Sequence, residues 1–480
     1  MVKKKAAVSP PRLISYAKDR VKWSSVPLSE VVAHGLVLTA SAYDVDVRYY
    51  RYLVEQGKYP TVPLSELTDA YVCSRFRRIW VAKSDLPIYQ PSAAANMNPR
   101  PDGFLSRNTK TNIDALRVRK GQVLLTCSGT IGNVSYVSDT LDAKIFSHDL
   151  MRLNFAHSCN AGYVYTYLKS AVGTKLLTAS SYGAVITHIE PEHLVSVPIP
   201  NPPDTEKQHI HELITASYRL RDEANALIDK ATAMLLKELN LPPDIDSFYP
   251  PTDSVKCFSV KLAELQGRFD VSYHLPIVKK IKNHLAQYAA EVTNVGDKRV
   301  SRDVILPGRF KRMYVDEGRG RVFIGGKQIG ELDPSNKKYL SASYHEQRIY
   351  RELELHENMT LITCSGTVGR VNLVPRHWEN WAASQHIIRV VPANDDLAGY
   401  LYIFLASPYA LPLIMRNVYG AVIDEIDAKQ VGAIPIPLLE NQARQTQINT
   451  LALTANAKRY EAYRLEQEAI RYVNEEIISV

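Results

Sequence analysis

Two stretches of the chain repeat small or apolar residues at alternating spacings of four and three, which marks one face of an α-helix. The first runs from about Thr205 to Asn240, and its repeating positions are Leu213, Ser217, Leu220, Ala224, Leu227, Ala231 and Met234. The second runs from about Asn441 to the C-terminus, and its repeating positions are Ile448, Leu451, Ala455, Ala462, Leu465 and Ala469, interrupted by Lys458. We therefore predict two long helices, each roughly 50 Å long at about 1.5 Å per residue. We expect them to pack antiparallel as a coiled coil; the alternative is that each packs only on its own domain.

A shorter pattern precedes each helix and predicts a strand, a tight turn and a second strand. In "GQVLLTCSGTIGNVSYV", which begins at Gly121, an apolar run leads into a turn and then into alternating residues. Gly129 and Gly132 in this copy, and Gly366 and Gly369 in a second copy, suit a turn because glycine adopts positive φ without strain. A Gly-x-x-Gly turn could also hold a phosphate through its N–H groups. We favour a structural turn, because the Gly-Lys-Ser/Thr ending of a nucleotide-binding loop is missing and a strand follows.

These patterns belong to an internal repeat. Cys127 and Cys364 lie 237 positions apart, and the same shift pairs Arg152 with Arg389, Gly162-Tyr163 with Gly399-Tyr400, and two copies each of "YGAVI" and "PIP". Upstream, the shift is 234 for "VKWSSVPLSEV" with "VKCFSVKLAEL" and for "RFRRIWV" with "RFKRMYV", and 224 for "VDVRYY" with "FDVSYH". Between these anchors the halves share almost nothing. Recognition loops vary in this way on a fixed scaffold, although duplication followed by drift leaves the same pattern.

The repeat predicts an α+β protein with two tandem homologous domains of mixed α/β structure, each followed by a long helix. The predicted boundaries are a basic N-terminal tail at 1–20, a first domain at 21–203, a central spacer helix at 204–241, a linker at 242–254, a second domain at 255–438 and a C-terminal spacer helix at 439–480.

Composition indicates a globular cytoplasmic protein with an anionic partner. Of the 480 residues, 45% are hydrophobic and 22% charged, and no apolar run approaches the ~20 residues of a membrane span. The N-terminus lacks the apolar core of a secretory signal. Five cysteines without a C-x-x-C pair predict neither a disulfide framework nor a metal site. A net charge of +8 favours a polyanion such as nucleic acid.

The repeated segments "RFRRIWV" and "RFKRMYV" combine cations with aromatic residues, as phosphate-binding surfaces do. Strand alternation would place Arg75, Arg77 and Ile79 on one face and Phe76, Arg78 and Trp80 on the other. The alternative is a solvated strand edge whose cations prevent aggregation. The candidate DNA-binding residues are Arg75, Arg77, Arg78, Lys83, Arg107, Lys110, Arg309, Lys311, Arg312, Arg321, Lys327, Lys337 and Lys338.

No catalytic residues are predicted. Cys127 is followed by Ser128, but Ser147-His148 becomes Ser384-Gln385 in the second half, so no base is repeated beside the candidate nucleophile. "NPPD" at Asn201 resembles the Asn-Pro-Pro-aromatic loop of amino-methyltransferases, with aspartate in place of the aromatic residue. We interpret it as the entry to the first long helix, with Asp204 or Thr205 as its N-cap.

Together, "TCSGTIGNV" and "TCSGTVGRV", the two runs from "YGAVI" to "PIP" and the long helix after each resemble the DNA-specificity (S) subunit of Type I restriction–modification enzymes. The resemblance covers nearly all of 21–480, twice. It departs at the helix starts, where the Glu-Gln common in the family is Lys207-Gln208 and Arg444-Gln445.

The resemblance implies a non-catalytic protein with two target recognition domains that read double-stranded DNA. The paired helices would dock two methyltransferase subunits, which would bind S-adenosylmethionine and methylate adenine; this chain would hold no cofactor. A restriction (motor/nuclease) subunit that joins the complex would cut unmethylated DNA. Because the variable segments differ, we expect an asymmetric two-part site. The alternatives are a sequence-independent DNA-binding scaffold and a stand-alone DNA-processing enzyme, which would need a repeated carboxylate cluster for metal.

Overall fold

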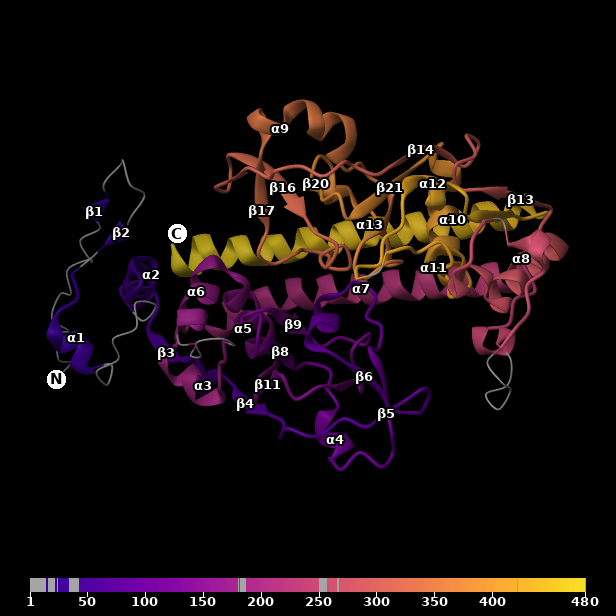
Figure 1. The fold of residues 1–480 in the computed structure, drawn as a ribbon. Helices are drawn as coiled ribbons and strands as arrows, with labels where there is room; N and C mark the ends of the chain where they lie inside the picture. Colours follow the sequence, from indigo (N-terminus) through magenta and orange to yellow (C-terminus); the bar gives the residue numbers. More distant parts are fainter. Residues whose placement is uncertain are drawn as a thin grey trace. The chain divides into compact units, whose positions relative to one another are not determined.

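The computed structural model describes residues 14–15, 22–23, 25–33, 43–179, 181, 187–249, 257–265, 267–420 and 422–479. The chain forms two compact units (Figure 1). Unit 1 comprises Met1–Arg219 and Arg464–Val480, and unit 2 comprises Leu220–Tyr463. Each of the two long helices therefore contributes one part to unit 1 and another part to unit 2.

The long helices are α7, Asp204–Glu238, and α13, Gln442–Tyr472, which continues as a π-helix. In unit 2, Lys458 pairs with Glu223 at 2.6 Å and Arg444 with Glu238 at 3.7 Å. The residue numbers rise along one helix as they fall along the other, so the helices are antiparallel. The same holds in unit 1, where Tyr472 donates a hydrogen bond to Glu206. Antiparallel packing of the two helices is thus confirmed.

The buried face of each long helix differs from the predicted seam at every second position. In α7, Ile214 and Ile228 are buried, whereas the predicted Leu213, Leu220 and Leu227 are half-buried. In α13, the buried residues Ala452, Arg459 and Glu466 each follow a half-buried residue of the predicted seam, Leu451, Lys458 or Leu465. The physical reason is that each helix also packs on its own domain, as its members in the domain cores show, and this shifts the centre of the buried face by one position.

Unit 1 contains two four-stranded sheets, ordered β4-β11-β8-β9 and β10-β6-β7-β5, and two-stranded pairs β12-β3 and β1-β2. The strands are β1 Ile14–Ser15, β2 Lys22–Trp23, β3 Thr61–Pro63, β4 Asp69–Val72, β5 Trp80–Val81, β6 Pro87–Tyr89, β7 Gly103–Leu105, β8 Val123–Thr126, β9 Val134–Tyr136, β10 Ile145–Phe146, β11 Leu150–Asn154 and β12 Pro198–Pro200. The helices are α1 Leu28–Ala33, α2 Val45–Glu55, α3 Leu64–Leu67, α4 Ile113–Leu116, α5 Ser158–Lys169 and α6 Ala171–Ala179.

Unit 2 contains sheets ordered β14-β21-β18-β19 and β15-β17-β16-β20, and the pair β13-β22. The strands are β13 Glu291–Asn294, β14 Ser301–Ile305, β15 Tyr314–Val315, β16 Gly320–Ile324, β17 Lys338–Ser341, β18 Thr360–Thr363, β19 Val371–Leu373, β20 Ala382–Ala383, β21 Ile387–Pro392 and β22 Pro435–Leu438. The helices are α8 Pro276–Tyr288, α9 Ala342–Arg348, α10 Asp395–Ala406, α11 Ala410–Met415 and α12 Ala428–Gly432.

The two units share one topology in their four-stranded sheets and in the pair that contains the "PIP" strand, while the β1-β2 pair has no counterpart among the described strands of unit 2. Each four-stranded sheet of unit 2 repeats the strand order of its counterpart, including one parallel pair, β6 with β10 and β16 with β20. The remaining pairs among the strands described are antiparallel, and the predicted hairpin forms in both copies: Val123 pairs with Tyr136, and Thr360 with Leu373. The predicted tandem α/β domains are therefore confirmed.

One predicted correspondence is wrong. "VDVRYY" begins helix α2, whereas "FDVSYH" at Phe269 mostly forms the short 3-10 turn Val271–His274. The counterpart of α2 is α8, because each precedes the strand that pairs with the "PIP" strand, β3 with β12 and β13 with β22. A match of only six residues could not show that the first segment begins a helix while the second forms a turn just before one.

Tight contacts join each domain to its long helix at repeated positions. A Cβ atom on Gly162 would lie 2.5 Å from the Cα of His211 in α7, and one on Gly399 would lie 2.4 Å from the carbonyl oxygen of Asn449 in α13. The tyrosine after each glycine, Tyr163 or Tyr400, donates a hydrogen bond of 2.6 Å to the last proline of the "PIP" strand. The repeated Gly-Tyr pairs thus place the long helix on the domain.

Candidate DNA interface

The repeated cationic segments are not strands, so the predicted alternation of their faces is wrong. Residues 73–79 and 306–313 have no regular structure, and strands begin only at Trp80 and Tyr314. The physical reason is topological: each segment leaves one four-stranded sheet, at β4 or β14, and enters the other, at β5 or β15. A segment that passes between two sheets cannot pair with either one along its length.

One arginine of each segment is held by the loop that precedes β11 or β21. Arg78 donates to Asp149 at 3.3 Å, and Arg312 donates to Gln385 at 2.9 Å. Burial, and the charges of Arg78 and Arg75, lower the pKa of His148 in the same loop. These contacts fix the cationic segments on equivalent loops of the two units.

The other cations of these segments remain exposed. Arg75 and Arg77 lie at the surface of unit 1, and Lys311 lies at the surface of unit 2. The Arg309 side chain is 83% exposed and pairs with Glu425 at 3.3 Å. Exposed guanidinium and ammonium groups on an anchored backbone suit contact with phosphate, which requires charge and little else.

The turn after Cys127 or Cys364 is bonded to a second segment of its own unit. Gly129 N–H donates to Thr187 at 3.1 Å, and Gly366 N–H donates to Asp424 at 2.9 Å. The φ angles of both glycines are positive, +76° and +74°, as are those of Gly132 and Gly369, +87° and +88°. Because the N–H groups of Gly129 and Gly366 already have protein partners, and Gly132 and Gly369 donate to the strand before the turn, none of the four is available for a phosphate.

In unit 2 the described residues of the second "YGAVI" segment, which exclude residue 421, belong to an exposed loop beside this turn. Tyr419 and Glu425 exchange backbone hydrogen bonds of 2.9 and 2.7 Å at its base, while Val422 and Ile423 are 96% and 56% exposed at its tip. Glu425 also pairs with Arg309, so the cationic segment, the turn and the loop meet on one surface. The first copy, residues 182–186, lies outside the described residues.

In each unit, a buried arginine donates hydrogen bonds to the backbone beneath the exposed surface. Arg152 and Arg389 are fully buried on β11 and β21 and donate to backbone carbonyl groups. Their acceptors are equivalent in the two units: Leu116, Phe146, Ser147 and Leu150 in unit 1, and Leu353, Ala383, Ser384 and Ile387 in unit 2. Burial lowers the pKa of Arg389 to about 9, so the side chain is still charged at neutral pH.

The remaining candidate cations do not gather at this surface as one group. Arg107 forms a bidentate pair with Asp85, at 3.1 and 2.7 Å, and this pairing lowers the pKa of Asp85. Arg321 donates to the carbonyl of Asn380 at 3.2 Å, and Lys337 pairs with Asp333. Exposed are Lys83, Lys110, Lys327 and Lys338, the last with its ammonium 5.2 Å from the ring centroid of Tyr314.

The two repeated cysteines are not arranged for nucleophilic catalysis. Both thiols are buried, and burial raises the pKa of Cys127 to about 11 and that of Cys364 to about 12. The reactive form of cysteine is the thiolate, which these pKa values suppress at neutral pH. In the part of the chain that the structure describes, no group of three or more His, Cys, Asp or Glu residues could hold a metal ion.

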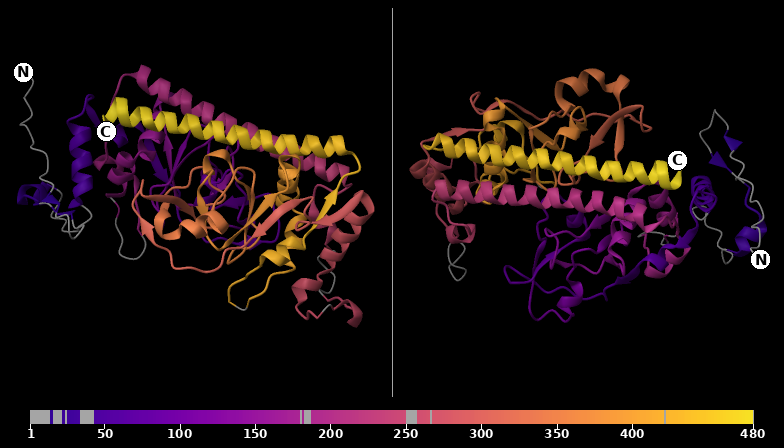
Figure 2. Two further views of the ribbon diagram at one scale, coloured as in Figure 1. Left: turned by 90° about the horizontal axis from the view of Figure 1, so that it is seen from above. Right: turned by 180° about the vertical axis from the view of Figure 1, so that it is seen from behind.

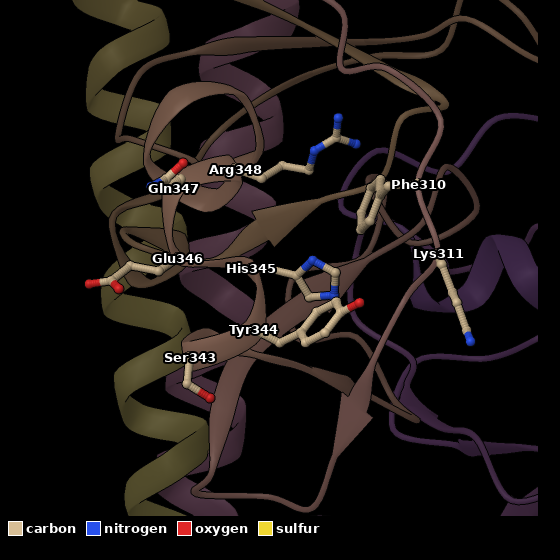
Figure 3. A pocket seen from close by; sticks show the side chains of 8 residues that line it. All are labelled: Phe310, Lys311, Ser343, Tyr344, His345, Glu346, Gln347 and Arg348. Atoms are coloured by element: carbon tan, nitrogen blue, oxygen red, sulfur yellow. The ribbon is translucent and has the colours of Figure 1, made fainter.

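In unit 2, a helical segment that the sequence patterns did not predict lines a pocket of about 520 Å³ (Figure 3). Helix α9 supplies one wall, and Phe310 and Lys311 of the cationic segment supply the other. The π-helix Ile349–Leu353 follows α9 directly. A signal was present, because His345, Ile349 and Leu353 recur at a spacing of four after Ser341, which caps α9. The corresponding segment of unit 1 is of similar length but contains only the four-residue helix α4.

Two copies of one framework, each with exposed cations on an anchored segment, define a protein with duplicated nucleic-acid recognition domains. A sequence profile of the Type I restriction modification DNA specificity domain matches residues 80–230 and 322–450, which together make more than half of the chain. The chain belongs to this family, whose members are DNA-specificity subunits of restriction–modification systems.

Several solved structures are similar along most of the chain. The S subunit of a Type I restriction–modification system from M. genitalium has 13% identity and a TM-score of 0.34, over 88% of this chain and 96% of that chain. The HsdS subunit from Thermoanaerobacter tengcongensis has 17% identity and a TM-score of 0.26, over 87% and 98%. No curated protein matched. Among the described residues, no helix is both long and apolar enough to cross a membrane.

Proposed function

We propose that each unit of this chain reads one half of an asymmetric, two-part DNA site. The observation that carries the proposal is the contrast between frame and connections. The four-stranded sheets of the two units match strand for strand, whereas the connection from β7 to β8 contains only the short helix α4 and the connection from β17 to β18 contains α9 and a π-helix. Two domains that share their sheets but differ in the exposed connections would recognise two different DNA sequences.

The exposed cations would position the DNA, and the unlike connections would read it. Contacts with phosphate set register and orientation, whereas side chains at the base edges distinguish sequence. Arg75 and Arg77 in unit 1, and Arg309 and Lys311 in unit 2, are suited to the first task. We expect an unread gap between the half-sites, which would lie about one helical turn of DNA apart, or roughly 10 base pairs.

The chemistry would belong to partner subunits. Two methyltransferase subunits would dock on the paired long helices, bind S-adenosylmethionine and methylate adenine, and a restriction (motor/nuclease) subunit could join them. The suppressed thiolates of Cys127 and Cys364 support a reading role for this chain.

Co-purification of the chain with the products of neighbouring genes, followed by mapping of methylated adenines, tests the proposal. We expect methylation within two dissimilar half-sites separated by a fixed gap. A single continuous palindrome would contradict it. So would equal affinity for random and selected duplexes at the same salt concentration, which a sequence-independent scaffold predicts, or cleavage of DNA by the chain alone with magnesium.

A further inference from the structure

The two units differ in the helical structure of the segment that ends at the residue bonded to the buried arginine. In unit 1 this segment ends with α4, whose last residue, Leu116, accepts a hydrogen bond from Arg152. In unit 2 it contains α9 and the π-helix, whose last residue, Leu353, accepts the equivalent bond from Arg389. Figure 1, and the orange helix in the right view of Figure 2, place this segment at the outer edge of unit 2. Eleven residues lead from the end of β7 to Leu116 and twelve from the end of β17 to Leu353, so two segments of nearly equal length fold differently and end at the same framework point.

The inner side of this helical segment is firmly attached to the rest of unit 2. His345, Ile349 and Leu353 are buried, and the Nε2 atom of His345 accepts a hydrogen bond of 3.2 Å from the N–H of Met313 in the cationic segment. Burial lowers the pKa of His345, which favours the neutral ring that this bond requires. Arg348 lies over the ring of Phe310, 5.0 Å from its centroid. The segment thus presents a fixed outer surface.

The outer side is exposed and polar, with groups that recognise base edges. Ser343, Glu346, Gln347 and Tyr350 occupy positions i, i+3, i+4 and i+7, which share one helix face. In Figure 3, Ser343, Glu346 and Gln347 point away from Phe310, whereas Tyr344 and His345 lie toward it. A glutamine amide matches the edge of adenine, and a glutamate carboxylate accepts from cytosine.

Two large aromatic side chains of the segment are also exposed, Tyr344 by 65% and Tyr350 by 63%. Each tyrosine presents an aromatic ring and a hydroxyl group that can donate or accept a hydrogen bond. Tyr344 lines the same pocket as Lys311, which is the exposed cation of the neighbouring segment. The base-reading face therefore has a cationic, aromatic-lined hollow on its flank.

We propose that α9 and the π-helix form the reading element of the second domain. The face of Ser343, Glu346, Gln347 and Tyr350 enters the major groove of the second half-site, which is wide enough to admit a helix. The sugar–phosphate backbone at the edge of that groove lies against Tyr344 and Lys311. This inference rests on the proposed function, because it assigns one half of the site to a particular element.

Selection from a pool of randomised duplexes, with the complete chain in its complex, tests the assignment. The wild type is compared with Gln347→Ala and with the double variant Glu346→Ala/Gln347→Ala. The control is Glu357→Ala, which removes an exposed glutamate of unit 2 outside this face. Because the altered side chains are exposed, thermal unfolding should match the wild type.

We expect the Gln347 variants to lose base preference in one half of the selected site only. Their affinity for the wild-type duplex should fall between about 5-fold and 150-fold, as lost base contacts do, while Glu357→Ala selects the wild-type site. Variants that still select the wild-type sequence in both halves would overturn this inference and leave the proposed function standing. A wild type that selects no two-part site would overturn both.

Discussion

At the scale of single residues, the duplicated arginines on β11 and β21 explain why both recognition surfaces keep one shape. Arg152 and Arg389 each bind four carbonyl groups from separate segments, and the two sets of acceptors are equivalent. Buried carbonyls need hydrogen-bond donors, and the planar guanidinium supplies several at once. Each arginine therefore joins the end of the variable segment to the loop before its strand.

Replacement of Arg389 by methionine should destabilise unit 2 strongly. The substitution leaves several buried carbonyls without donors, each at a cost of about 1–3 kcal/mol, so we expect a loss of about 3 kcal/mol or more. The urea concentration at the midpoint of unfolding measures this loss. Arg389→Lys keeps the charge but offers fewer donors in a fixed geometry, so its midpoint should lie between those of the wild type and Arg389→Met. Arg302→Met, at an exposed position, should change stability by less than about 0.5 kcal/mol. An unchanged midpoint for Arg389→Met would refute this role.

At the scale of elements, short helices are placed by contacts with the long ones. Gly399 in α10 allows the backbones of α10 and α13 to approach, and the side chain of Asn449 accepts hydrogen bonds from the N–H groups of Gly399 and Tyr400, at 2.8 and 3.1 Å. Gly162 in α5 has the same role against α7, where it donates to His211 at 3.2 Å. The glycines are thus needed for close packing and not for a turn.

Gly399→Ala should displace α10 from α13 and lower the stability of unit 2. The added Cβ would lie 2.4 Å from a backbone oxygen, which cannot rotate away as a side chain can. Overpacking of this kind costs roughly 1–3 kcal/mol, measured as a lower midpoint of thermal or urea unfolding. Gly308→Ala is the matched control, because its Cβ would meet only the end of Arg348, at 3.8 Å. Equal stability of the two variants would show that the approach is not tight.

At the scale of the whole molecule, the duplicated frame assigns the two tasks of the proposed function, positioning DNA through its phosphates and reading its bases, to different segments. The exposed cations occupy the same segment in both units. Under the proposed function, they would supply a similar affinity in each half, independent of sequence. The segment after β7 or β17 folds differently in the two units. Under the proposed function, the two halves would therefore discriminate different bases. An excess of positive charge, +8 over 480 residues, is consistent with a partner that presents phosphate to both units.

Arg77→Ala in unit 1 and Lys311→Ala in unit 2 should each weaken binding to all duplexes by a similar factor. Each lost phosphate contact reduces the salt dependence, so the slope of log K against log salt should fall by about 0.9 per variant and about twice that in the double variant. Binding titrations over a range of salt concentrations measure both effects, and Arg302→Ala controls for charge alone. A variant that altered base preference and left the slope unchanged would reassign that residue to base reading.

The sequence by itself determined the two long helices, the hairpins and the duplicated frame. Helical periodicity, turn glycines and repeat spacing are local or internal properties, readable without knowledge of neighbours. Only the tertiary structure decided that residues 73–79 form no strand, that burial centres on Ile214 and not Leu213, and that Arg309 remains exposed while Arg312 is held. Each of these outcomes depends on tertiary contacts. Residues 73–79 must connect two sheets, the long helix packs on a domain as well as on the other helix, and a loop supplies the hydrogen-bond partner of Arg312. Such partners come from distant parts of the chain, and the spacing of residues along it does not specify them.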